Sequence, residues 1–104
     1  MTITEEGALL PLTAVYTTTT STVLICEVAD ELKESITHWM VYLNDIMYQL
    51  SINADNNVGI PHLYCRLYNL DRETEYTAYV KAVDDQGTES VKSNVVTFTT
   101  GPKF

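Results

Sequence analysis

The sequence predicts an all-β domain, a seven-stranded antiparallel β-sandwich, and two observations lead to that prediction. Turn signals recur about every 8–12 residues, and the stretches between them are rich in Thr, Val, Ile and Tyr, which favour strands. No stretch shows the periodicity of an amphipathic helix, and the short charged segment 30–35 fits better as a loop. We therefore expect the apolar side chains to be buried between two sheets.

The spacing of the turn signals places the seven strands. We predict them at 12–17, 22–28, 37–43, 47–51, 63–68, 75–83 and 91–99. Asn44 and Asp45 predict a tight turn, residues 53–61 a longer crossover, and residues 84–87 a hairpin loop whose glycine takes a positive φ. The threonine-rich run 17–22 is compatible with a hairpin between the first two strands.

Alternation along each strand separates an inward face from an outward face, because successive side chains point to opposite sides of a sheet. We assign the more apolar set of each strand to the core. The predicted core residues are Leu12, Ala14, Leu24, Cys26, Val28, Trp39, Val41, Leu43, Leu63, Cys65, Leu67, Tyr76, Ala78, Val80, Ala82, Val96 and Phe98. Burying one large apolar side chain contributes about 1.5–3 kcal/mol, so a slip of one residue in register would forfeit most of this stabilisation.

Length and charge limit the classes of function. A chain of 104 residues with 45% hydrophobic residues has the size of one domain, which we place at 11–100 between an N-terminal extension, 1–10, and a C-terminal tail, 101–104. Fourteen acidic and six basic residues give a net charge of −8, which opposes binding to nucleic acid and to anionic membrane lipid. The first residues lack the pattern of an export signal, so a chain starting at Met1 is expected to be made in the cytoplasm.

Three segments carry a resemblance to the fibronectin type III family. From Leu70 to Ser90 the chain has a leucine, a tyrosine six residues later at Tyr76, an alternating strand and a glycine-containing loop, as that family does. Segment 93–100 resembles the family's last strand, and segment 36–45 resembles its third strand. The resemblance covers residues 12–100 in total.

This resemblance implies both the sheets and a structural role for individual residues. It implies one sheet of the strands at 12–17, 22–28 and 63–68, and a second sheet of the strands at 47–51, 37–43, 75–83 and 91–99. It also implies that Tyr76 forms a tyrosine corner, in which the hydroxyl bonds to backbone a few residues upstream, with Leu70 as its packing partner. Trp39 occupies the position of the family's core aromatic residue on the third strand.

One core position departs from the family pattern. Cys26 stands where the family usually has an inward tryptophan, and we expect Trp39 on the facing sheet to compensate for the lost volume. The family topology makes the strands of Cys26 and Cys65 antiparallel neighbours, so a disulfide is conceivable if their Cα atoms lie within about 4.4–6.8 Å. We favour two reduced core thiols, because buried free cysteine is a common small apolar residue.

Residues for metal binding or catalysis form no recognisable pattern. His38 on an outer face and His62 in a loop are not placed to converge with the core cysteines, and Cys-x-x-Cys spacing is absent. Asp84 and Asp85 beside Gly87 lack the spacing of a calcium-binding loop, so a solvated hairpin tip is expected. Without a nucleophile elbow or a phosphate-binding loop, we expect no enzymatic activity, no cofactor and no metal.

The outward faces are more informative, because both are rich in apolar and aromatic residues. We expect one face to carry Met40, Tyr42, Tyr79 and Val95, and the other to carry Val15, Val23, Ile25, Tyr64 and Tyr68. Two interpretations stay open. Such residues favour strands wherever they point and stabilise a sheet through cross-strand pairs. Alternatively, one face docks on a partner, since contiguous exposed apolar patches mark interaction sites.

Function must be inferred from features other than the fold. A free-standing domain with a Met start and no export signal suits a small phage virion protein, made in the host cytoplasm and docked on a capsid or tail protein. This is our first hypothesis. The alternative is a spacer or adhesion module from a larger extracellular bacterial protein or carbohydrate-active enzyme. Both hypotheses expect a protein partner, and a homo-oligomer is compatible with either.

Overall fold

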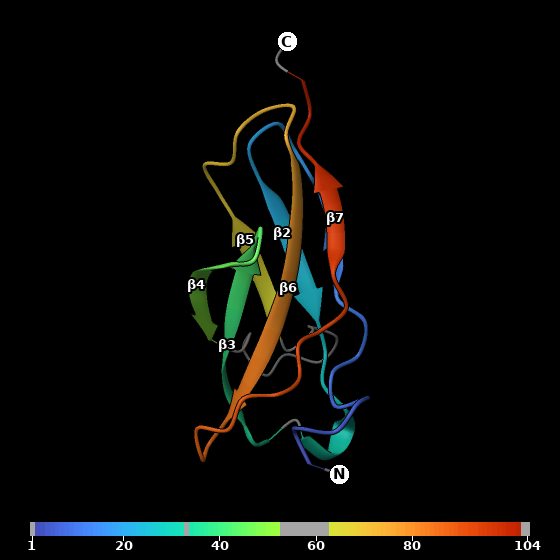
Figure 1. Ribbon diagram of the computed structural model, residues 1–104, viewed down its shortest axis with the longest axis vertical. Coiled ribbons are helices and arrows are strands. Elements are labelled where there is room, and N and C mark those ends of the chain that lie inside the picture. Colours follow the sequence, from blue (N-terminus) through green and yellow to red (C-terminus); the bar gives the residue numbers. More distant parts are fainter. Residues whose placement is uncertain (1, 33, 53–62, 103–104) are drawn as a thin grey trace.

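Two antiparallel sheets form the sandwich in a computed structural model that describes residues 2–32, 34–52 and 63–102 (Figure 1). The first sheet has the strand order β1-β2-β5, with bounds β1 Thr13–Val15, β2 Thr22–Cys26 and β5 Leu63–Leu67. The second has the order β4-β3-β6-β7, with bounds β4 Ile46–Ile52, β3 Ile36–Leu43, β6 Glu75–Asp84 and β7 Val96–Thr99. The predicted all-β sandwich and its two sheets are confirmed.

Several strand bounds differ from the predicted ones, for local reasons. Strand β1 ends earlier than expected because Tyr16 takes a positive φ of 52°, which a strand does not accommodate. The charged segment after β2 contains one 3-10 turn, η1 (Asp30–Leu32), whose last residue is buried. No helix in the described part of the chain is long and apolar enough to cross a membrane. The predicted crossover at 53–61 lies outside the described residues.

The two predicted tight turns have the backbone that their residues favour. Asn44 and Asp45 have φ values of 51° and 65°, the positive values that a two-residue hairpin turn requires. Gly87 has a φ of 79°, and its N–H donates to the Asp84 carbonyl at 3.1 Å. The Asp84 carboxylate accepts the N–H groups of two residues in its own loop, at 2.9 and 2.8 Å. This carboxylate therefore organises the hairpin tip.

The core lies between the sheets and contains the predicted inward residues. Trp39 is completely buried, and only Ala14 and Val96 of the predicted set are half-buried rather than buried. The segment before residue 11 packs on the domain as well: Ile3 and Ala8 are buried in the core. Backbone bonds fix that segment, since Ala8 accepts the N–H of Ala29 at 2.9 Å. The N-terminal residues therefore close one end of the sandwich (Figure 1).

Tyr76 has the geometry of the tyrosine corner that the resemblance implies. Its hydroxyl accepts the backbone N–H of Asp71 at 2.8 Å, five residues upstream. The ring is 8% exposed and stacks on Phe98, with centroids 5.6 Å apart. Leu70 is buried, and its N–H donates to the Thr20 carbonyl at 2.9 Å. The corner thus ties the β5–β6 connection to the β1–β2 hairpin.

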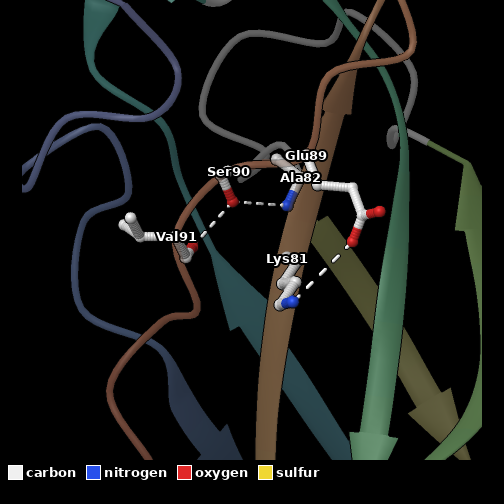
Figure 2. A network of polar contacts seen from close by, with 5 residues as sticks. All are labelled: Lys81, Ala82, Glu89, Ser90 and Val91. Carbon is white, nitrogen blue, oxygen red and sulfur yellow. Dashed lines mark hydrogen bonds and ion pairs between the residues drawn. The ribbon is translucent and has the colours of Figure 1, made fainter.

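The predicted strand at 91–99 begins five residues late. The residues before it bond to β6, but not in the one-to-one register of a regular strand pair. Ser90 donates its N–H to the Ala82 carbonyl at 2.8 Å, while the Ala82 N–H donates to the Ser90 hydroxyl at 2.9 Å (Figure 2). Ser93 and Val80 repeat this exchange at 2.9 Å in both directions. Three residues of this segment therefore match two residues of β6. Serine hydroxyls replace the backbone carbonyls that a regular strand would present.

The two lateral sides of the sandwich differ. On the side of β1 and β7, the Asn94 side chain accepts the Leu12 N–H at 2.7 Å and donates to the Leu12 carbonyl at 3.1 Å. This amide joins the two sheets as a strand neighbour would. Strands β4 and β5 lie on the opposite side (Figure 1), where the Tyr48 hydroxyl donates to the Tyr68 carbonyl at 3.1 Å. That contact comes from a side chain rather than from strand pairing.

Candidate interaction surface

On the outer face of the four-stranded sheet, the two tyrosine rings are in contact with other residues of the domain. Tyr42 and Tyr79 are direct strand partners, and their rings stack with centroids 4.7 Å apart and an interplanar angle of 11°. The Lys81 ammonium lies 5.7 Å from the Tyr42 centroid, and the Lys92 ammonium lies 5.0 Å from the Tyr79 centroid. Each ring therefore has both a stacking partner and a cation. This arrangement supports the cross-strand interpretation for this face.

The other residues of this face add little to that arrangement. Lys81 also pairs with the Glu89 carboxylate at 3.7 Å (Figure 2), and both side chains are partly exposed, so the ion pair contributes little by itself. Met40 is half-buried on the same face. Val95 is 50% exposed but lies outside β7. Met40, Tyr42 and Tyr79 thus remain predicted partner contacts, with much of their surface already used within the domain.

The outer face of the three-stranded sheet is more open. Strand β5 alternates strictly, so its buried residues face the core while Tyr64 and Arg66 point outward. Tyr64 is 45% exposed and Tyr68, just after the strand, is 58% exposed. The Arg66 guanidinium lies 6.0 Å from the Tyr68 ring centroid. We call Tyr64, Arg66 and Tyr68 the tyrosine face.

Residues of β2, the central strand of this sheet, lie beside the tyrosine face. Ile25 is the strand partner of Tyr64 and is half-buried. Val23 lies between Val15 and Arg66 on the two neighbouring strands and is 1% exposed. The prediction that Val23 is available for contact with a partner is wrong, because Val23 is buried on the central strand, with a paired strand on each side. Alternation gives the direction of a side chain but not its exposure.

Charge distinguishes the strands of the three-stranded sheet from the acidic loops around them. Strands β1, β2 and β5 contain no acidic residue, and Arg66 is their single charged residue. The chain as a whole carries −8, and its acids lie mainly in turns and loops. The face therefore presents two tyrosine rings and one cation on an otherwise acidic molecule.

The two cysteines are buried, form no disulfide and are not direct strand partners. Strand register places Cys26 opposite Leu63, and Cys65 opposite Leu24. The Cys26 thiol donates to the Leu10 carbonyl at 3.2 Å. Burial, with a smaller contribution from the nearby Glu27 charge, raises the pKa of Cys26 to about 12. The thiol is therefore protonated at neutral pH and is a poor nucleophile.

The predicted histidines and acids assemble no metal site within the described residues, where no group of three or more metal-ligating side chains occurs. The His38 ring contacts the neighbouring Thr37 hydroxyl at 3.0 Å, and His62 lies outside the described residues. An open groove of about 820 Å³ runs between residues 6–11 and residues 91–94. Its serine, Ser93, already has its hydroxyl engaged by the Val80 N–H and the Asn94 carbonyl. The groove thus presents no activated nucleophile.

Similarity to solved structures establishes the fold, although no protein-family model and no curated protein sequence matches the chain. A structure of the Yersinia enterocolitica family 28 exopolygalacturonase matches 92% of the chain with a TM-score of 0.75 and 21% identity, and the chain spans 20% of that enzyme. The fibronectin type III domain of human fibronectin type III domain containing protein 3 matches 91% with a TM-score of 0.66 and 23% identity, over 85% of its length.

A third similar structure, that of a myokine, matches 95% of the chain and 100% of its own length, with a TM-score of 0.69 and 22% identity. Sequence identities this low indicate a shared architecture and give no information about activity. The strand order, the Tyr76 corner and these similarities agree with the family that the sequence resembles. The chain is a fibronectin type III-like β-sandwich.

Proposed function

We propose that the protein is a non-enzymatic binding module that docks on a protein partner through the tyrosine face. The observation that carries the proposal is the exposure of Tyr64 and Tyr68 around Arg66, on a sheet without acidic residues. Tyrosine and arginine are enriched in the cores of protein interfaces, where acids are depleted. Burying a tyrosine ring at a hot spot typically contributes about 2 kcal/mol or more to binding.

Charge indicates what the partner presents. Arg66 would be buried at the centre of the docked face, and a buried guanidinium needs an opposite charge or several acceptors. A carboxylate on the partner meets that need in a bidentate arrangement. The acidic loops outside the face would then repel a partner whose acidic surface extends beyond that one contact. The partner is therefore a protein with a local acid in an apolar setting.

The form of this proposal that we favour is a phage virion protein, made in the host cytoplasm and docked on a capsid or tail protein. Docking through the three-stranded sheet supports it, because the hairpin tips at 44–45 and 84–87 belong to the other sheet and would stay exposed. A decoration protein requires this division between a docked face and displayed loops.

Cosedimentation of the labelled protein with purified capsids and tails of the encoding phage tests this form. We expect saturable binding that Arg66→Glu weakens at least tenfold. Arg72→Glu is the matched control, since Arg72 is exposed and lies outside the tyrosine face, and it makes the same change in charge. Absence of saturable binding would refute the virion role. Equal losses in both variants would show that net charge, not the face, governs binding.

A second candidate is a spacer within a larger extracellular enzyme or adhesin. The similarity to 20% of the length of a polygalacturonase favours it, because that part of a larger enzyme has the same architecture. This candidate predicts no binding to virions, and a reading frame that continues into a catalytic or adhesive domain. Sequencing the flanking gene region separates the two candidates without a binding assay.

A further inference from the structure

A hydrogen bond joins the tyrosine face to the other sheet. The Tyr48 hydroxyl, on β4, donates to the Tyr68 carbonyl at 3.1 Å, on the lateral side of the sandwich formed by β4 and β5 (Figure 1). Both residues are exposed, Tyr48 by 43% and Tyr68 by 58%. Tyr68 belongs to the proposed docking surface, whereas Tyr48 lies outside it. The bond therefore connects a residue of the face with a residue of a different sheet.

Tyr68 lies beyond the strand that carries the rest of the tyrosine face. The ladder between β2 and β5 ends at the pair of Thr22 and Leu67, one residue before Tyr68. After Tyr68 the chain turns, because Asn69 takes a positive φ of 59°. Tyr64, in contrast, lies inside the ladder. Strand pairing thus fixes the backbone of Tyr64 but does not extend to Tyr68.

The strand that carries Tyr48 is irregular at this residue. Val41 of β3 pairs with Gln49, and the next residue, Tyr42, pairs with Met47. Tyr48 lies between these two partners and is the extra residue of a β-bulge. A bulge points a side chain in a direction that regular alternation would not give. This irregularity is consistent with a side chain that reaches the opposite sheet instead of following the alternation of β4.

We propose that Tyr48 is a positioning residue for the tyrosine face: its hydroxyl fixes the Tyr68 peptide and so holds the Tyr68 ring beside Arg66 before a partner arrives. This inference rests on the proposed function, because it gives Tyr48 a role in docking through that face. The Arg66 guanidinium lies 6.0 Å from the Tyr68 ring centroid, so a displaced ring would also change the surroundings of the cation. Tyr48 acts through Tyr68 and not through its own contact with the partner.

The effect of such a residue on affinity comes from preorganisation. A side chain that is mobile in the free protein must become ordered when it is buried in an interface, and ordering one side chain weakens binding roughly two- to tenfold. The bond from Tyr48 restricts Tyr68 before docking, so removing it transfers this cost to the binding step. The bond itself is exposed, and water can replace it. We therefore expect its loss to change docking more than the stability of the domain.

Tyr48→Phe tests the proposal by removing one oxygen atom while keeping the ring. In cosedimentation with the purified capsids and tails, we expect this variant to bind roughly two- to tenfold more weakly than the native chain. Its midpoint in urea unfolding should stay the same, which separates positioning from a loss of folded structure. Tyr79→Phe is the matched control, since it removes the same atom on the outer face of the four-stranded sheet, and it should leave binding unchanged.

The free protein allows a second test that needs no partner. Nuclear magnetic relaxation of the amide nitrogens reports the order of each backbone position on the picosecond-to-nanosecond timescale. In Tyr48→Phe we expect lower order parameters at Tyr68 and Asn69, and a shifted resonance of the Arg66 side chain. Tyr64 should keep its order parameter, because strand pairing fixes it.

The two measurements separate a failure of this inference from a failure of the proposed function. If the native chain does not bind, the virion form of the proposed function is wrong, and relaxation alone decides whether Tyr48 positions Tyr68. Equal order at Tyr68 in the native chain and in Tyr48→Phe would overturn the inference in either case. Lower order at Tyr68 with binding equal to that of the native chain would also overturn it, because Tyr48 would then order the loop without contributing to docking.

Discussion

Substitution of Tyr76 by phenylalanine tests the anchoring of the β5–β6 connection with the loss of a single oxygen atom. The hydroxyl accepts the Asp71 N–H at 2.8 Å, and the ring stacks on Phe98. Phenylalanine keeps the stack and the burial, since only the oxygen is removed. The variant therefore isolates the contribution of one hydrogen bond to the free energy of unfolding.

The structure sets the expected size of the effect. A hydrogen bond within a protein contributes about 0.5–1.5 kcal/mol net, and a buried donor left unpaired costs about 1–3 kcal/mol. The bond is only partly buried, so water can reach the Asp71 N–H in part. We therefore expect Tyr76→Phe to lower the free energy of unfolding by about 1–2 kcal/mol. For a domain of this size the melting temperature falls by roughly 5–15 °C.

Urea unfolding, followed by tryptophan fluorescence of the buried Trp39, measures this change. The slope with urea should stay constant while the midpoint falls. Tyr79→Phe is the matched control, because it removes the same atom from a half-buried ring that stacks on Tyr42 and contacts the Lys92 ammonium through its faces. An unchanged midpoint for Tyr76→Phe, or equal losses for both variants, would refute the role of the corner.

Three further predictions concern the segment that joins the sheets on the side of β1 and β7, and the Cys26 thiol. Asn94→Ala removes both bonds to Leu12, so we expect a loss of about 1–2 kcal/mol in urea unfolding and faster exchange of the Leu12 amide. Ser93→Ala leaves the buried Val80 N–H without its acceptor and should cost about 1–3 kcal/mol, measured in the same way. The pKa of Cys26 is raised from about 9 to about 12, so the folded state holds a proton that the unfolded state releases. Stability from this group is complete below pH 9 and is lost as the pH rises toward 12; Cys26→Ala should show a shallower decline of the melting temperature across that window.

Much of the fold follows from local pattern in the sequence. Strict alternation in β5 and β6 gives the direction of nearly every core residue, because both strands pair regularly on at least one side. The Leu70–Tyr76 spacing gives the corner. The start of β7 could not be found by alternation, because Ser90 and Ser93 bond to β6 through their hydroxyls. These two serines are three residues apart, whereas their partners on β6 are two residues apart. A serine repeat at this spacing beside a regular strand is the signal that would have indicated it.

The interaction surfaces are harder to predict than the core, because exposure depends on neighbours that lie far away in the sequence. Val23 and Tyr64 both point outward from the same sheet, yet Val23 is 1% exposed and Tyr64 is 45% exposed. The difference is their place in the sheet: Val23 is on the central strand, and Tyr64 is on an edge strand. The exposure of Met47 in β4 has the same origin, since that strand also ends a sheet. Sequence pattern gives the direction of each side chain, and strand order decides which are open.

Strand order also decides what an added strand would meet on each lateral side of the sandwich. On the side of β1 and β7, the Asn94 amide occupies both backbone groups of Leu12, so an added strand would first have to displace two hydrogen bonds. On the other side, β4 presents a longer edge, and the contact across the sheets there uses the Tyr48 hydroxyl rather than a backbone pair. Removing the Asn94 bonds should therefore make association at this side easier. We expect Asn94→Ala to associate more strongly than the native chain as its concentration rises, measured by sedimentation equilibrium; equal behaviour of the two chains would contradict the blocking role of Asn94.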